Sequence, residues 1–181
     1  MEPTIKTGTI IFSHPAPYGF STANLPLGSA APESRKYLAR TTPHRGDIII
    51  FRLNRFQGRK FIKRVIGIPG DHIQIKNNIL SVNGHTTNLT DTGHTYPCDH
   101  QNRTPCIVQT ESIPDILPPH AITYEKGAKS PEVDVVLRDR YFVMGDNRPH
   151  SLDSRWPDDQ GAGLVPLSRI IGQYVAEKTN D

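Results

Sequence analysis

Lys63 is the residue whose neighbours could most change the chemistry of a side chain in this sequence. It lies in the largely apolar run 61–66, and in a β-strand it shares one face with Phe61 and Val65. A lysine on an apolar, desolvated face loses affinity for its proton, because burial disfavours the charged form. To act as a general base near neutral pH its pKa must fall by roughly 3 units from about 10.4, at a cost of about 4 kcal/mol. The alternative is an edge-strand lysine whose ammonium group reaches water.

A polar segment at 145–155 could supply partners for such a lysine. It contains three Asp or Asn residues, two Ser and two Arg within eleven positions. The hydroxyl of Ser151 can donate or accept a hydrogen bond and could orient a neutral amine. Asp153 and Arg155 are close enough in sequence to pair across a turn. The alternative is a plain polar turn, in which Asp and Asn satisfy backbone amides.

The elements that must position these residues are strands. Apolar and alternating patterns predict strands at 9–12, 48–53, 60–68, 133–137, 141–144 and 170–177. Residues 71–82 resemble a hairpin around Asn77-Asn78, with a second turn at Asn83-Gly84. No long stripe with a helical period occurs, so the chain is predicted to be rich in β-structure.

Composition narrows the class of protein further. The length of 181 residues predicts one domain, or one domain with a sizeable insertion. The hydrophobic fraction is 35%, and 14 Gly with 16 Pro favour strands and turns over a helical bundle. A net charge of +3 argues only weakly for nucleic-acid binding, so none is expected. No apolar run reaches the 18 or more residues of a membrane span. On composition alone, the basic pairs Arg59-Lys60 and Lys63-Arg64 are interpreted as a solvated sheet face.

Two segments depart from the strand pattern. Residues 14–44 scatter Tyr18, Phe20, Leu25, Leu27 and Leu38 among Pro and Gly, which predicts an exposed apolar loop that contacts a membrane or a partner. Residues 85–130 change in character and are predicted to form an inserted small subdomain. The remaining ranges, 1–84 and 131–181, are predicted to form one discontinuous core.

Four segments taken together resemble, in order and spacing, the boxes of bacterial type I signal peptidases, also called leader peptidases. They read Met-Glu-Pro-Thr-Ile at 1–5, Arg-Gly-Asp-Ile-Ile-Ile-Phe at 45–51, Phe-Ile-Lys-Arg-Val-Ile-Gly-Ile-Pro-Gly-Asp at 61–71 and Gly-Asp-Asn-Arg-Pro-His-Ser-Leu-Asp-Ser-Arg at 145–155. The stretch 163–172 is also similar to the family's last strand region. The resemblance covers residues 1 to about 175. It implies a mainly β fold, with a coiled, antiparallel, barrel-like catalytic core and a smaller inserted β-rich subdomain.

The resemblance also implies a role for each matching residue. Lys63 matches the general base that takes a proton from a serine hydroxyl and so activates it for attack on a peptide carbonyl. Ser151 matches the serine that holds the lysine amine in place. Asp153 and Arg155 match a supporting ion pair behind the site.

The implied substrate is a secretory precursor protein. Four residues fall where the family builds shallow apolar pockets for the small side chains of an Ala-x-Ala-type cleavage motif: Met1, Ile5, Phe61 and Ile62. The resemblance implies a serine endopeptidase that removes signal peptides at the periplasmic side of the bacterial cytoplasmic membrane. It further implies contact with membrane lipid beside the active site, a monomer, and no metal or other cofactor.

One departure from the family pattern concerns the nucleophile. The family serine directly precedes the methionine of Ser-Met-x-Pro-Thr, and the printed sequence begins at that methionine. A membrane anchor is expected upstream. The explanations are a truncated chain, a start codon assigned one residue late, or a lineage that has lost activity. None of Ser13, Ser21, Ser29 or Ser81 lies in a motif able to replace the nucleophile, so the chain as printed is expected to be inactive.

A second departure is Pro149-His150, where the commonest family version has Asp-Asn. We expect a changed loop there and unchanged chemistry. His150 does not indicate a Ser-His-Asp triad, because no serine lies in a nucleophile-elbow pattern.

Cys98 and Cys106 enclose a short loop in the segment 85–130. Several Gram-negative members of the family are similar in having one disulfide in this region, and the periplasm is oxidising. Such a bridge would contribute about 2 to 3 kcal/mol on the chain-entropy model. A metal site that adds His94 and His100 is disfavoured by the spacing of the cysteines, and free thiols are a further alternative.

Two further functions stay open at this point. One is a non-catalytic periplasmic module of the same fold that binds signal peptides by strand addition without cutting them. The other is a conjugation-associated relative that processes one dedicated substrate.

Overall fold

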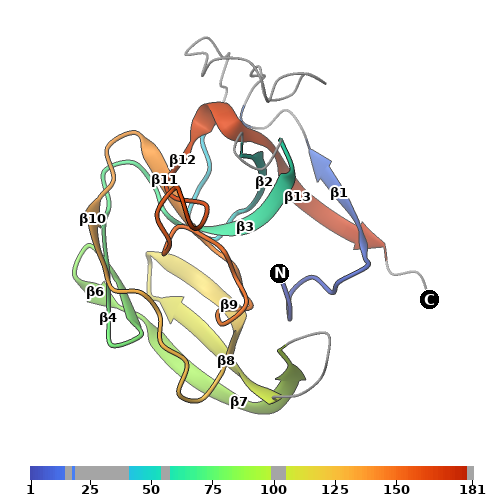
Figure 1. Ribbon diagram of the computed structural model, residues 1–181, viewed down its shortest axis with the longest axis vertical. Helices are drawn as coiled ribbons and strands as arrows, with labels where there is room; N and C mark the ends of the chain where they lie inside the picture. The colour runs from blue at the N-terminus through green and yellow to red at the C-terminus, as the bar shows by residue number, and fades with distance from the viewer. Residues whose placement is uncertain (15–17, 19–40, 54–57, 99–104, 179–181) are drawn as a thin grey trace.

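The computed structural model of this chain describes residues 1–14, 18, 41–53, 58–98 and 105–178. The fold is mainly β, with antiparallel strands arranged in three sheets (Figure 1). Within the described ranges the one helix is a short 3-10 turn, η3 (Leu167–Arg169). None of the described helical structure is long and apolar enough to cross a membrane.

A six-stranded antiparallel sheet contains most of the predicted strands. Its order is β1 (Ile10–His14), β13 (Ile170–Lys178), β2 (Ile48–Arg52), β3 (Lys60–Gly67), β11 (Arg140–Met144) and β12 (Val165–Pro166). Strand β3 lies between β2 and β11. Lys63 is therefore on an interior strand, which contradicts the alternative of an edge-strand lysine.

A four-stranded sheet follows in the order β10 (Val133–Val136), β4 (His72–Lys76), β5 (Ile79–Val82) and β6 (His85–Thr86). Both of its predicted turns are confirmed. Asn77 and Asn78 have φ values of 52° and 65°, the left-handed conformation that a two-residue hairpin turn requires. Asn83 and Gly84, with φ of 54° and 81°, make the same kind of turn between β5 and β6.

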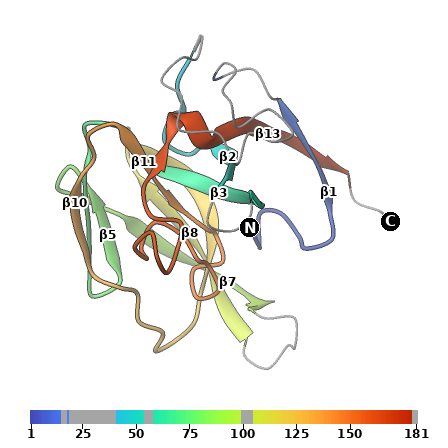
Figure 2. The same ribbon diagram turned by 45° about the horizontal axis from the view of Figure 1, so that its top comes forward.

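The third sheet contains β7 (Asn88–Pro97), β8 (Pro105–Ile113) and β9 (Leu117–Tyr124), and lies inside the segment 85–130. These strands could not be located individually from hydrophobic alternation, because β7 is exposed along nearly its whole length. In both views the four-stranded sheet lies on the opposite side of the molecule from β1 and β13 (Figures 1 and 2). The boundaries proposed for an inserted subdomain stay a prediction.

Strand β3 separates two hydrophobic clusters because its side chains alternate between faces. Val65 packs with Ile49, Phe51 and Val143 in one cluster. Ile66 belongs to the other, which also contains Leu117 of β9 and is completed by residues of β4, β5 and β11: Ile73, Ile75, Leu80, Val82 and Phe142. The two faces of this strand are therefore both buried, and polar residues on it need partners.

The prediction of an exposed apolar loop at 14–44 is wrong for Tyr18. This side chain is buried in the cluster around Phe51, and its hydroxyl donates to Asp47 Oδ2 at 2.7 Å. A tyrosine can enter a core in this way when its hydroxyl finds an acceptor. The other apolar residues named for that loop, Phe20, Leu25, Leu27 and Leu38, lie outside the described residues.

Candidate active site

Lys63 is half-buried on β3, where it pairs in register with Ile49 of β2. Its pKa is lowered from the ordinary value, first because burial disfavours the ammonium and also because the positive charge of Arg155 is near. The carboxylates of Asp153 and Asp146 oppose this effect without cancelling it. The fold therefore makes the ammonium form of Lys63 less stable than that of a solvated lysine, which increases the share of the amine that can accept a proton.

Gly145 packs close to both Ser151 and Lys63. It directly follows β11, whose Met144 pairs with Arg64 of β3. A Cβ atom added at Gly145 would lie 2.8 Å from Ser151 Cβ, would overlap its hydroxyl, and would be 3.7 Å from Lys63 Cδ. Glycine is required here for close packing, because any side chain would collide with Ser151.

Ser151 itself is buried, and its hydroxyl could still form a further hydrogen bond. Among the described residues its Oγ has no hydrogen bond of normal geometry, although it lies near enough to the Asp153 carboxylate to lower the pKa of that group. A buried hydroxyl without a partner is costly, so such groups frequently serve a site. A neutral amine nearby would be a suitable partner.

Asp153 is fully buried and paired with Arg155, as predicted from their spacing. Arg155 Nε donates to Oδ1 at 2.8 Å and Nη2 to Oδ2 at 2.9 Å, while the amide of Gly145 donates to Oδ2 at 3.0 Å. Burial alone would raise the pKa of Asp153, but these contacts outweigh it and hold the pKa below its ordinary value. Asp153 therefore stays ionised beside Lys63 and is neutralised by Arg155.

A second buried ion pair was missed in the sequence. Arg64 is 7% exposed, so its assignment to a solvated sheet face is wrong. Its Nε and Nη2 donate to the two carboxylate oxygens of Asp146 at 2.9 and 2.7 Å. The alternation of side chains along the strand could have indicated this pair. Arg64 faces away from Lys63 and lies on the same face as Ile66, where a buried cation needs a carboxylate as its partner.

This ion pair also holds the first residues of the chain. The hydroxyl of Thr4 donates to Asp146, and Arg64 Nη2 reaches the same hydroxyl at 3.5 Å. The amide of Ile5 donates to the carbonyl of Met1 at 3.0 Å, which closes a turn. The turn places the amino group of Met1 near Lys63: burial lowers the pKa of that amine, and the charge of Lys63 lowers it further.

The four residues proposed to line substrate pockets lie around this arrangement. Ile5 is buried, and Met1, Phe61 and Ile62 are half-buried. Phe61 stacks on Phe51 with ring centroids 5.9 Å apart, on the same face of β3 as Lys63. That these residues form pockets for a substrate stays a prediction.

Comparison with known proteins identifies the family of this chain. The family model described as signal peptidase, peptidase S26, matches residues 1–177. The chain belongs to the signal peptidase S26 family. The type I signal peptidase resemblance inferred from the four boxes is thereby confirmed.

The chain is similar to several curated relatives of this family. It is 29% identical to the signal peptidase I of Rickettsia massiliae (strain Mtu5) over 96% of this chain and 65% of the relative. It is 30% identical to the signal peptidase I of Rickettsia typhi (strain ATCC VR-144 / Wilmington), over 96% and 66%. A crystal structure of a signal peptidase I from Enterococcus faecalis V583 is 26% identical, with a TM-score of 0.43, covering 75% of this chain and 98% of that one. The chain thus spans just under two thirds of the length of the curated relatives it matches.

The segment 145–155 of this signal peptidase family member is held in place from several directions. Asn147 Nδ2 donates to the carbonyl of Cys98 at 3.0 Å, and Arg148 Nη1 donates to Glu111 Oε1 at 2.7 Å. His150, by contrast, is exposed on the turn. Residues of the segment 145–155 are therefore positioned by contacts to Cys98 and to the third sheet as well as by β3.

Cys98 and Cys106 are joined by a disulfide, with Cα atoms 5.4 Å apart. That separation lies in the usual range for disulfides. The structure thus puts both sulfurs in one bridge, whereas the alternative metal site also required His100, which lies outside the described residues. Because the carbonyl of Cys98 accepts from Asn147, the bridge lies next to the segment that holds Ser151.

Proposed function

We propose that this chain is the catalytic portion of a signal peptidase, a serine endopeptidase that removes signal peptides from secretory preproteins. The observation that carries the proposal is Lys63: a half-buried lysine with a lowered pKa, on a strand that passes close to Gly145 and the buried Ser151. A neutral, positioned lysine is the base that a Ser/Lys dyad requires. Membership of the signal peptidase S26 family supports the same activity.

Lys63 takes the proton from the nucleophilic serine as that oxygen attacks the scissile carbonyl. The family motif puts this serine directly before Met1, and the Met1 amino group lies near Lys63. The protonated lysine then gives its proton to the leaving amine, and water hydrolyses the acyl-enzyme with Lys63 again as the base. Ser151 orients the amine, while Asp153 and Arg155 act as positioning residues.

Substrate selection follows from the apolar residues beside the base. Met1, Ile5, Phe61 and Ile62 are proposed to form the shallow pockets that accept the small side chains of an Ala-x-Ala motif. The preprotein would be cut on the periplasmic side of the cytoplasmic membrane, with the catalytic portion in contact with lipid. No cofactor is proposed for this reaction, because the lysine itself moves the proton.

The proposal is tested by extending the chain with a serine directly before Met1. In detergent or lipid, this version should cut a preprotein after an Ala-x-Ala site, as seen by gel shift and by mass spectrometry of the products. An extension with alanine in place of that serine is the matched control and should be inactive. If the serine version binds the signal peptide without cutting it, the chain is a binding module and the peptidase proposal is wrong.

A further inference from the structure

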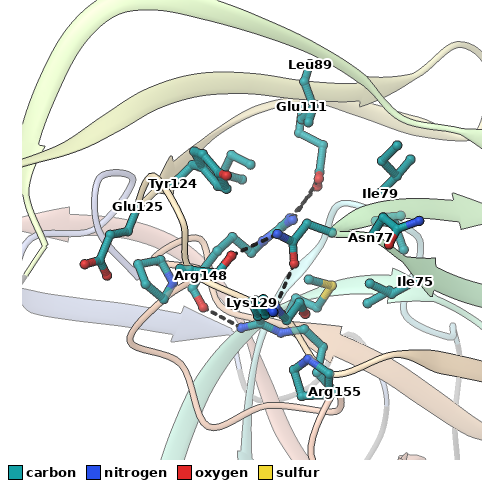
Figure 3. A pocket seen from close by; sticks show the side chains of 18 of the residues that line it. Ile75, Asn77, Ile79, Leu89, Glu111, Tyr124, Glu125, Lys129, Arg148 and Arg155 are labelled. Atoms are coloured by element: carbon teal, nitrogen blue, oxygen red, sulfur yellow. Dashed lines mark hydrogen bonds and ion pairs between the residues drawn. The ribbon is translucent and has the colours of Figure 1, made fainter.

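A cavity of about 350 Å³ lies between the four-stranded sheet and the third sheet. This volume falls within the range of small-molecule binding sites in proteins. Its apolar walls come from neighbouring strands of both sheets: Ile75, Ile79, Leu80, Leu89 and Ile122. In Figure 3, Ile75 and Ile79 lie on the opposite side of the cavity from Tyr124 and Glu125, with Arg148 between them.

Two of these apolar residues remain open to solvent. Ile79 is 50% exposed and Leu89 is 44% exposed, although both are large aliphatic side chains in strands. Exposed apolar side chains gathered at a cavity, in contrast to ones scattered singly, mark binding surfaces. The cavity therefore offers apolar area to a ligand without any rearrangement of the sheets.

Two hydrogen-bond donors at the cavity are not engaged by a carboxylate of the described residues. Arg148 Nε is buried without an acceptor, and exposed Lys129 makes no ion pair within the described part of the chain. The carboxylate of Glu111 is already engaged by Arg148 and His120. Cations lining the cavity outnumber carboxylates by three to two, Lys129, Arg148 and Arg155 against Glu111 and Glu125.

We propose that this cavity binds a small amphipathic ligand, whose apolar ring or chain lies between β5, β7 and β9 and whose anionic, hydrogen-bond-accepting head points to Lys129 and Arg148. The site is distinct from the proposed peptidase site. Neither Lys63 nor Ser151 lines the cavity, whereas Arg155 and Trp156 do. The ligand would thus contact the arginine that pairs with Asp153.

A pair of fluorescent probes tests separately whether the cavity binds an apolar body and whether it also binds an anionic head. Anilinonaphthalene sulfonate has an aromatic body and one anionic head, and N-phenyl-naphthylamine has the same body without the charge. Both should bind, and the sulfonate should bind roughly tenfold more tightly, the difference expected for about 1.4 kcal/mol from a charged hydrogen bond. Equal affinity of the two probes would overturn the proposal that the cavity recognises an anionic head.

Two lysines in the segment between β9 and β10 provide a matched pair of variants. Lys129 lines the cavity, whereas the exposed Lys126 does not. Lys129→Gln should weaken sulfonate binding at least fivefold and leave the neutral probe unchanged. Lys126→Gln, with the same change in net charge, should leave both within twofold. Equal weakening by the two variants would indicate attraction by overall charge and would overturn the site.

Methyl NMR of the complete chain locates the probe directly. With the sulfonate bound, shifts should change for Ile75, Ile79, Leu89 and Ile122 of the cavity. Ile10 and Val175, which are exposed on β1 and β13, report on adsorption elsewhere. Changes confined to these last two methyl groups, or no saturable binding below millimolar probe, would overturn the proposal independently of any peptidase activity.

Discussion

Lys63 shows how burial on an interior strand changes a single side chain. The same lysine on an exposed strand would keep an ordinary pKa, because water would solvate its ammonium. On β3 it loses that solvation, and the two nearby carboxylates restore only part of it. The neutral amine comes at a cost in stability, which is typical of residues selected for chemistry.

Replacing Lys63 with methionine should therefore stabilise the fold at neutral pH. The folded pKa is lowered, so the penalty is fully present below that pKa and disappears as pH rises toward the unfolded value near 10.5. Each unit of lowering corresponds to about 1.4 kcal/mol. Urea unfolding between pH 6 and 10.5 should show Lys63→Met more stable than the parent. The difference between their free energies of unfolding should become smaller as pH increases.

Lys60→Met is the control for this measurement, because Lys60 is exposed on the same strand. Its effect on stability should be small and independent of pH over that range. A gap for Lys63→Met that does not change with pH would mean that Lys63 is an ordinary solvated ammonium group. In the serine-extended chain, Lys63→Met should also abolish cleavage while Lys60→Met leaves it.

Gly145→Ala tests the close packing of Ser151 against Gly145, next to the proposed base Lys63. The added Cβ overlaps Ser151, so the variant should lose at least about 100-fold in cleavage by the serine-extended chain and about 1–3 kcal/mol in stability. Adding Ser151→Gly removes the overlap but also the hydroxyl. The double variant should regain stability and remain inactive; recovery of both would show that Ser151 has no part in the reaction.

Strand β8 has a role beyond pairing with β7 and β9. Its Glu111 is buried, accepts two hydrogen bonds from Arg148 and lies 3.2 Å from His120 Nε2 of β9. Burial alone would raise the pKa of Glu111, but Arg148 and His120 lower it to about 2. The carboxylate thereby ties the third sheet to the segment that contains Ser151.

Glu111→Gln should destabilise the chain by about 3–5 kcal/mol at pH 7, because it leaves Arg148 without its charge partner. The ionised Glu111 stabilises the fold above its unfolded pKa of 4.5, and that contribution is lost as pH falls toward 2. Urea unfolding at pH 7 and pH 3 should therefore show a smaller loss of stability with acid for the variant than for the parent. Glu132→Gln, at an exposed position, should lose as much stability with acid as the parent. If the parent and both variants lost the same stability between pH 7 and pH 3, Glu111 would not contribute to the acid dependence.

The molecule as a whole presents different surfaces at its two sides. Paired strands β1 and β13 expose Ile10, Phe12 and Val175, which are 51%, 54% and 62% accessible. They lead directly into the segment 14–44, for which lipid contact is predicted. On the opposite side (Figures 1 and 2), the four-stranded sheet exposes Val136 of β10 and Ile79 of β5.

Lipid binding should depend on the β1 side alone. Ile10→Ser with Phe12→Ser should reduce flotation with liposomes by roughly tenfold or more per side chain, since burying one such side chain contributes about 1.5–3 kcal/mol. Val136→Ser removes a similarly exposed residue and should leave flotation unchanged. An unchanged result for the β1 variant would remove these strands from the proposed membrane contact.

Much of the local structure follows from neighbouring residues. Alternation located β3 and the faces of Lys63 and Arg64, and the Asn-Asn and Asn-Gly turns predicted the hairpins of β4, β5 and β6 correctly. These features depend on contacts within a few residues, where side-chain direction and backbone preference suffice. Strand β7 of the third sheet was not located, because its mostly exposed side chains leave no alternating apolar pattern.

The partners of the charged residues were decided by tertiary structure. The sequence alone determined that Lys63 and Arg64 face opposite ways and that Asp153 and Arg155 can pair across a turn. It could not determine that Arg64 meets Asp146, 82 positions away, or that Gly145 packs close to both Ser151 and Lys63. Such contacts depend on the register of β3 with β11 and on the path of the segment after it. Burial then shifts the pKa values of Lys63 and Asp153, because only a folded core removes the water that would otherwise solvate these side chains.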